Sequence, residues 1–245
     1  MFEKYIPKKL IGSLYPHPQI DTGFYDFYQL VPSGIMMVAV SVDLREFTKE
    51  DVERALAPLD EYLELLMERQ VDIILQTGVP PVVLTGIEFH DKVLEYITEK
   101  TQKPAVSTIN CVIQAVKHLG LKKIVAANKW TDKMNETLKQ FFLRDEIEMV
   151  GFHNEALAMN VFMKSSVEES ARLAYELGME ALRKYPEAEG LYVGGGAWLS
   201  VPIVDALEKE FNKPVITNTT AQAWHLLNCL NMWESIPGRG ILLGS

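Results

Sequence analysis

The stretches Lys103–Gly120 (KPAVSTINCVIQAVKHLG) and Lys213–Asn231 (KPVITNTTAQAWHLLNCLN) decide the predicted fold, because they repeat one plan. Each begins with Lys-Pro and continues through a short apolar strand and a turn rich in Ser, Thr and Asn into an amphipathic stretch. Upstream of each, an apolar strand runs into a glycine-containing loop, IILQTGVPP at 73–81 and LYVGGGAW at 191–198. Two copies of one supersecondary plan predict two related lobes with a pseudo-twofold axis.

Strand-like runs alternate with amphipathic stretches along the whole chain, a pattern that predicts βαβ units and mostly parallel sheets flanked by helices. The predicted fold class is therefore α/β, in two pseudo-symmetric lobes. The predicted strands are Leu10–Leu14, Met36–Val42, Val71–Gln76, Ala105–Ser107, Lys123–Ala127, Ile147–Phe152, Gly190–Val193 and Pro214–Thr217.

The predicted lobes are residues 1–117 with 218–245, and residues 118–217. Ligands of open α/β sheets bind beyond the carboxyl ends of the strands, so we expect the functional site in a cleft between the lobes.

Two helix starts are visible in the sequence. Thr48 to Asp51 resembles a capping box ahead of an apolar series with helical spacing from Val52 to Leu66. Ser165 to Glu168 is predicted to open a second helix near Val167–Lys184.

Composition excludes several classes of function. The 245 residues carry a net charge of -9, and no run of Lys or Arg is present, which argues against nucleic acid. No apolar run reaches ~18 residues, so no membrane span is predicted. The first residues lack the features of a signal peptide, and two distant cysteines fit a reducing compartment, so we expect a cytoplasmic protein. No metal-ligand spacing is present, and neither a metal nor a cofactor is expected.

The glycine loops are the main candidate for ligand binding. Gly194, Gly195 and Gly196 lie between a strand and a helix, where glycine lets backbone N–H groups approach an anion such as a carboxylate. The simpler interpretation is a tight turn that needs positive φ. Thr77-Gly78-Val79 occupies the equivalent place in the other half. The Ser/Thr/Asn turns, including Asn218, can cap helices or bind a carboxylate.

These residues carry a resemblance to a known superfamily. The pattern from 71 to 120, AANKWTDKMNETL at 126–138 and the stretch 190–224 are similar to the aspartate/glutamate racemase superfamily, above all its arylmalonate decarboxylase and maleate isomerase branch. The likeness covers nearly the whole chain. It implies a cofactor-independent enzyme that holds a small carboxylic acid with backbone amides and Thr or Asn side chains.

The chain departs from that family at its reactive cysteines. The family positions fall at Gly78 and at Gly195, or at Gly194 if the loop is aligned differently. Glycine has no titratable group, so cysteine-based racemisation, protonation or thiol addition is excluded there. The resemblance also implies that Trp130 replaces a usual tyrosine, and that Asn154 matches a substrate-binding asparagine.

Other side chains are candidates for the missing acid or base. Cys111 lies at a predicted helix start, which would favour its thiolate; the alternative is a small buried helix residue. Glu88 and His90 are candidates for general acid–base work, and the alternative is an exposed first turn. His153 ends a predicted strand that faces the cleft, with a polar loop as the alternative.

Further residues are placed near the cleft by the predicted strand ends. Tyr15 and His17 follow the first strand. Trp130 and Trp198 are expected to form an apolar wall for the substrate, or else to pack the lobes together.

We weigh three functions. The leading hypothesis is a lyase or isomerase of the decarboxylase type, because an apolar wall destabilises one carboxylate while amides stabilise the developing enediolate. Its proton would come from water, His90, His153 or Cys111. The alternatives are a hydrolase or hydratase in which His and Glu activate water, and a non-catalytic small-acid binding protein. The expected partner is a small carboxylic acid, and homo-oligomerisation is left open.

Overall fold

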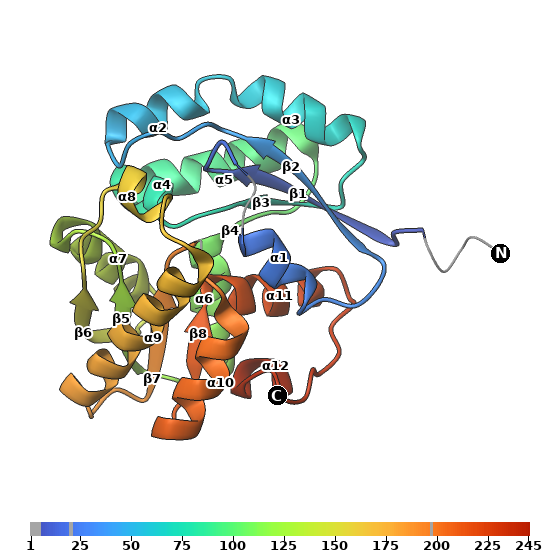
Figure 1. The fold of residues 1–245 in the computed structure, drawn as a ribbon. Helices are drawn as coiled ribbons and strands as arrows, with labels where there is room; N and C mark the ends of the chain where they lie inside the picture. The colour runs from blue at the N-terminus through green and yellow to red at the C-terminus, as the bar shows by residue number, and fades with distance from the viewer. Residues whose placement is uncertain (1–5, 20–21, 197) are drawn as a thin grey trace. The chain divides into compact units, whose positions relative to one another are not determined.

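The computed structural model describes residues 6–19, 22–196 and 198–245. Within these ranges the strands form two four-stranded parallel sheets, one in each of two compact units (Figure 1). Unit 1 comprises Met1–Ile20 and Val31–Thr108, and unit 2 comprises Asp21–Leu30 and Ile109–Ser245. The predicted α/β fold with two helix-flanked parallel sheets is confirmed.

Unit 1 has the strand order β2-β1-β3-β4, and every neighbouring pair is parallel. Its strands are β1 (Lys9–Tyr15), β2 (Ile35–Ser41), β3 (Ile73–Gln76) and β4 (Ala105–Ser107). Its helices are α2 (Lys49–Leu56), α3 (Leu59–Glu68), α4 (Pro80–Thr85) and α5 (Ile87–Thr101).

Unit 2 has the order β6-β5-β7-β8, again with parallel neighbours. Its strands are β5 (Lys123–Asn128), β6 (Glu148–Asn154), β7 (Gly190–Gly194) and β8 (Val215–Thr217). Its helices are α1 (Thr22–Tyr28), α6 (Thr108–His118, whose first residue ends unit 1), α7 (Asp132–Arg144), α8 (Met159–Phe162), α9 (Val167–Lys184), α10 (Ser200–Phe211), α11 (Asn218–Cys229) and α12 (Ile241–Gly244).

The two sheets share one topology, since adding four to each strand number of unit 1 gives the order in unit 2. This is the structural counterpart of the repeat between Lys103–Gly120 and Lys213–Asn231. Each of the eight predicted strands corresponds to an observed one, and β4 has the predicted bounds.

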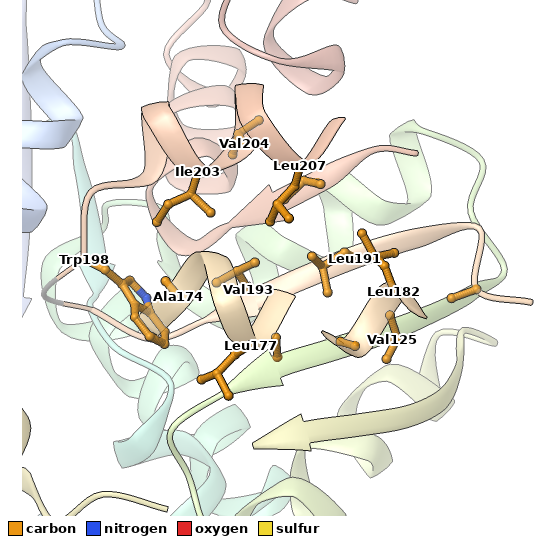
Figure 2. Packing of buried hydrophobic residues seen from close by; sticks show 14 residues of the cluster. Val125, Ala174, Leu177, Leu182, Leu191, Val193, Trp198, Ile203, Val204 and Leu207 are labelled. Atoms are coloured by element: carbon orange, nitrogen blue, oxygen red, sulfur yellow. The ribbon is translucent and has the colours of Figure 1, made fainter. Parts of the chain in front are cut away.

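The inner strands are buried because helices cover their sheet. β3 and β7 are buried along their whole length, and β5 is buried after its first residue, as expected for strands covered on both faces. In unit 2 the apolar side chains of β5 and β7 pack with those of α9 and α10, and Trp198 joins the same cluster (Figure 2). This core fixes the end of β7, from which the glycine loop begins.

One predicted helix is divided in two. Thr48 caps its start as predicted, because its Oγ1 accepts a hydrogen bond from the Asp51 amide at 3.2 Å. The apolar series, however, continues across Pro58, where α2 has ended and α3 begins. Proline has no N–H to donate within a helix, and Pro58 itself leaves the helical conformation at ψ 30°, so the apolar periodicity predicted one helix where there are two.

The second capping box lies one residue later than predicted. Ser166 caps α9, and its Oγ accepts from the Glu169 amide at 3.1 Å while the Glu169 carboxylate accepts from the Ser166 amide at 2.8 Å. The predicted pair, Ser165 and Glu168, has the same spacing, and only the backbone geometry distinguishes the two. The helix itself has the predicted bounds.

The units divide the chain at other residues than the predicted lobes. Residues 109–117 and 218–245 were assigned to the first lobe, whereas they cluster with unit 2. The physical reason is packing, because α11 contacts β8, α10 and α12, which all belong to unit 2. Over the described ranges, no helix combines the length and the hydropathy needed to cross a bilayer.

Candidate active site

The predicted site residues form two groups, one at the carboxyl edge of each sheet. Parallel strands end along the same edge, so loops that follow them lie close together within a unit. Unit 1 carries Tyr15, Thr77, Gly78 and Val79 at this edge, and unit 2 carries Trp130, Asn154, Gly194, Gly195, Gly196, Trp198 and Asn218.

The loop after β3 is held by hydroxyl groups of its own unit. The Thr77 Oγ1 lies 2.7 Å from the Ser13 Oγ, and the Gly78 amide donates to the Thr108 Oγ1 at 2.9 Å. The amide predicted to hold a carboxylate is therefore already paired. Val79 is buried, and Pro80 at the start of α4 supplies no N–H.

Gly78 is glycine for a conformational reason. Its φ of 91° lies in the left-handed region, and an added Cβ would meet the Pro16 Cγ at 3.0 Å. Gly78 therefore lies in a turn that needs positive φ, the simpler interpretation that was considered for Gly194–Gly196. A cysteine at this position would be strained.

Tyr15 and His17 are both buried at the end of β1. Their rings meet edge to face with centroids 6.0 Å apart, and the His17 carbonyl accepts from the Ser41 Oγ at 2.8 Å. These contacts fix the segment against β2.

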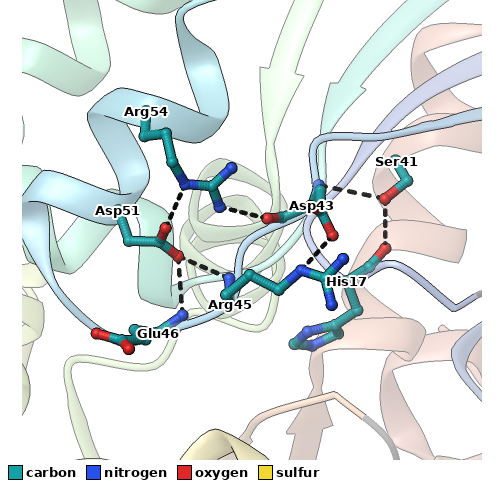
Figure 3. A network of polar contacts seen from close by, with 7 residues as sticks. All are labelled: His17, Ser41, Asp43, Arg45, Glu46, Asp51 and Arg54. Atoms are coloured by element: carbon teal, nitrogen blue, oxygen red, sulfur yellow. Dashed lines mark hydrogen bonds and ion pairs between the residues drawn. The ribbon is translucent and has the colours of Figure 1, made fainter.

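The loop that follows β2 holds a network of charged groups (Figure 3). The Asp51 carboxylate accepts from the Arg54 Nε at 2.6 Å and from the amides of Arg45 and Glu46 at 2.6 and 2.8 Å. Burial opposes ionisation of Asp51, but these hydrogen bonds outweigh it, so its pKa lies below the ordinary value. The Arg54 Nη2 also donates to the carbonyl of Asp43, whose φ is 56°.

His90 is buried within α5, in contrast to the exposed first turn considered for it. Its Nε2 lies 2.8 Å from the Ser107 Oγ at the end of β4, and its Nδ1 lies 3.0 Å from the Asp91 Oδ1. A hydroxyl, an imidazole and a carboxylate are thus joined in series. Both His90 and Ser107 are fully enclosed.

Glu88 lies away from this series. Its side chain is 85% exposed and pairs with the Lys92 Nζ at 2.7 Å, which lowers the pKa of Glu88. The structure therefore does not join Glu88 and His90 as an acid–base pair. Positions i and i+2 of a helix diverge, which explains the separation.

Cys111 has the environment of the alternative considered for it, a small buried helix residue. Cys111 is fully buried in α6, and burial raises the pKa of its thiol well above the ordinary value. Desolvation disfavours the charged form and outweighs the helix N-terminus here. Cys229, the last residue of α11, is exposed.

The glycine loop of unit 2 is shaped by two tryptophan rings. A Cβ on Gly194 would lie 2.8 Å from the Trp130 Cη2, and a Cβ on Gly195 would lie 2.7 Å from the Trp198 Cζ2. Gly195 also has a φ of 141°. The rings occupy the space that side chains on this loop would need, so both tryptophans pack against the backbone in the core of unit 2.

Lys129 is a site residue that the sequence analysis missed. It follows the last residue of β5, which pairs with Gly194, and only 2% of its surface is exposed. Its Nζ donates to the Gly196 carbonyl at 3.0 Å and lies 4.2 Å from the ring centroids of Phe162 and Trp198. A charged residue directly after a buried strand was the pattern that could have identified it.

Asn154 holds the loop after β5 in place. As the last residue of β6, it donates from Nδ2 to the Trp130 carbonyl and to the Asp132 Oδ1, both at 3.0 Å. The Trp130 amide donates to the Asn128 Oδ1 at 3.0 Å. Asn154 thereby positions the residue that packs on Gly194.

Two further candidates have partners within unit 2. The His153 Nε2 lies 2.6 Å from the Glu180 Oε2 of α9, the helix that covers this sheet. The Asn218 Oδ1 accepts from the buried Tyr192 hydroxyl at 2.7 Å, and burial raises the pKa of Tyr192. Thr217 caps α11, as expected for one residue of each turn.

A metal centre is not supported by the part of the chain that the structure describes. No group of three or more His, Cys, Asp or Glu side chains there has the arrangement of a metal site.

Comparisons with known proteins agree with this architecture. The family model described as arylmalonate decarboxylase matches residues 25–243. An arylmalonate decarboxylase of Bordetella bronchiseptica is 19% identical over 191 residues, 76% of this chain and 77% of that protein.

Solved structures show the same fold. A liganded arylmalonate decarboxylase variant, with one glycine changed to cysteine and one cysteine to serine, has a TM-score of 0.84 at 17% identity, over 96% of this chain and 98% of that one. The maleate isomerase of Pseudomonas putida S16, as an alanine variant with maleate, has a TM-score of 0.82 at 17% identity, over 96% and 97%. A Nocardia farcinica maleate cis-trans isomerase variant with a covalent succinylcysteine intermediate has a TM-score of 0.82 at 18% identity, over 96% and 98%.

Proposed function

The chain belongs to the arylmalonate decarboxylase family, and on that premise we propose that it is a cofactor-independent decarboxylase of a small carboxylic acid. The family and its maleate isomerase neighbours support the broader class, a lyase or isomerase.

The observation that carries the proposal is the packing of tryptophan rings on Gly194 and Gly195, where the rings fill the space of a side chain. A succinylcysteine intermediate, as in the Nocardia farcinica isomerase, needs a thiol on the protein. Gly78, Gly194 and Gly195 provide none, and Cys111 is enclosed with a raised pKa. Decarboxylation needs no covalent bond to the enzyme and is therefore the favoured reaction.

The chemistry proceeds in two steps. The bond between the α-carbon and one carboxylate breaks, CO₂ leaves, and the bonding electron pair enters the remaining carboxyl group as an enediolate. Donors fixed at the loops stabilise that charge. A proton from water then adds to the α-carbon. Asn154 and Trp130 act as positioning residues that hold the loop.

Turnover in D₂O tests the proposal. The purified chain is incubated with malonates that carry aryl or alkyl groups, with maleate and with 2-hydroxy acids, and is followed by ¹H NMR. We expect loss of CO₂ from a malonate and one deuterium at the α-carbon. Binding without turnover across the panel would instead support a small-acid binding protein.

A hydrolytic function is the second candidate, favoured by the series Asp91–His90–Ser107, which matches the order of groups in acyl-transfer triads. Ser107 and His90 are fully enclosed, which favours a structural role. Hydrolysis of a panel of esters and thioesters, measured for the unmodified chain and for Ser107→Ala, distinguishes a catalytic role of the series from a structural one. Hydrolysis abolished by this change would support the hydrolase.

A further inference from the structure

The side chain of Lys129 lies inside unit 2. Removing an ammonium group from water is costly unless polar or aromatic partners compensate it. The Gly196 carbonyl at 3.0 Å accepts a hydrogen bond from the ammonium, and the faces of Phe162 and Trp198, each 4.2 Å from Nζ, attract a cation. A carbonyl and two ring faces are groups that attract a cation, so these contacts suit an ammonium group beside the loop.

Trp198 brings a second donor to the same loop. Its side chain is 2% exposed, and its indole Nε1 makes no hydrogen bond to any residue that the structure describes. A Cβ on Gly195 would lie 3.0 Å from this nitrogen, so the N–H group lies directly beside the loop. The nitrogen is visible on the Trp198 ring in Figure 2. A buried donor of this kind needs an acceptor.

We propose that the Lys129 ammonium and the Trp198 indole N–H form the carboxylate-binding pair of unit 2. The pair rests on the proposed function, because it takes a carboxylate of the same substrate. It assigns Trp198 a polar role in place of the predicted apolar wall. A dicarboxylic acid fits best, since one carboxylate can meet this pair while the other reacts.

Malonate binding, measured by calorimetry, tests whether the charged group of Lys129 binds a carboxylate. We expect Lys129→Met to weaken malonate binding at least about 10-fold, the effect of losing a hydrogen bond to a charged group. Binding of malonamide, which has the same shape without charge, should change little. Lys133→Met, on the exposed face of α7, is the control and should bind malonate as the unmodified chain does.

The Trp198→Phe variant tests the indole N–H group as a donor. Trp198→Phe keeps an aromatic face for Lys129 and removes the N–H group, so we expect about 3- to 10-fold weaker malonate binding. An unchanged malonate affinity in both Lys129→Met and Trp198→Phe would overturn the pair.

An NMR experiment on the unmodified chain tests the proposal even if the variants misfold. The ¹⁵N chemical shift of a buried lysine ammonium should change when malonate is added and should not change when malonamide is added. A chemical shift that is unchanged at saturating malonate would overturn the proposal. Turnover unaffected by Lys129→Met would refute the pair alone. Malonate binding that depends on Lys129 without any turnover would refute the decarboxylase alone.

Discussion

At the scale of single residues, the glycines of unit 2 are explained by what packs on them. The Trp130 ring lies against Gly194, and the Trp198 ring lies against Gly195, which also has positive φ. Gly196 differs, because an added Cβ there would meet no atom within 4 Å. The three adjacent glycines are therefore under different constraints.

Gly195→Cys should destabilise the fold without creating thiol chemistry. Positive-φ strain of about 1–3 kcal/mol and overpacking of about 1–3 kcal/mol against Trp198 predict a loss of about 2–6 kcal/mol in the free energy of unfolding. Urea denaturation measures the loss. Gly196→Cys is the matched control, and equal stability of the two variants would contradict the packing explanation.

Residue types alone predicted some of the site and not the rest. The glycine loops and the cap at Thr217 followed from their place at strand ends. The sequence does not show that Lys129 is enclosed, because a lysine is expected at the surface until the rings of Phe162 and Trp198 are placed around it. The sequence likewise does not show that Cys111 is enclosed and that its pKa is raised, because burial depends on the tertiary structure.

At the scale of elements, the caps of α9 and α2 decide where helices begin. Ser166→Ala should lower the free energy of unfolding by about 1 kcal/mol, because it removes the acceptor for the Glu169 amide. Thermal or urea unfolding measures this. Ser165→Ala is the neighbouring control, and a larger loss there would return the cap to the residue that the sequence suggested.

The loop before α2 makes stability depend on pH. The folded-state pKa of Asp51 lies below its ordinary value of 3.8, so its contribution is complete above about pH 4 and is lost as the pH falls through the folded-state pKa. Between pH 5 and 2.5, the unmodified chain should lose more stability than Asp51→Asn. Urea midpoints across this range measure the difference.

The control for this pH dependence is Asp205→Asn, which removes an exposed carboxylate paired with Lys209 on α10. Its midpoints should follow those of the unmodified chain. If Asp51→Asn and the unmodified chain showed the same pH dependence, Asp51 would not contribute to the loss of stability at low pH.

At the scale of the whole molecule, a bound acid should stabilise the fold. A ligand at 100 times its dissociation constant adds about 2.7 kcal/mol, which for a chain of this size raises the melting temperature by about 5–10 °C. We expect malonate to do so and Lys129→Met to reduce the shift at the same concentration. Differential scanning calorimetry measures it, and a melting temperature insensitive to malonate would count against acid binding.

The topology was the most predictable property. Parallel sheets follow from alternating strands and helices, and the repeat of Lys-Pro stretches anticipated the repeated strand order. The division into units was harder to predict from the sequence, because it depends on whether α11 packs with β8 or elsewhere. Sequence patterns specify local partners better than contacts between distant helices.

The tryptophan packed on Gly194 also bears on how this protein can change over generations. A single Gly194→Cys mutation would bring the new Cβ within 2.8 Å of the Trp130 ring, so this mutation is disfavoured before any catalytic benefit accrues. A cysteine at this position needs two replacements together, one on the loop and one after β5. The packing therefore favours, at this one position, chemistry that does not use a nucleophilic sulfur.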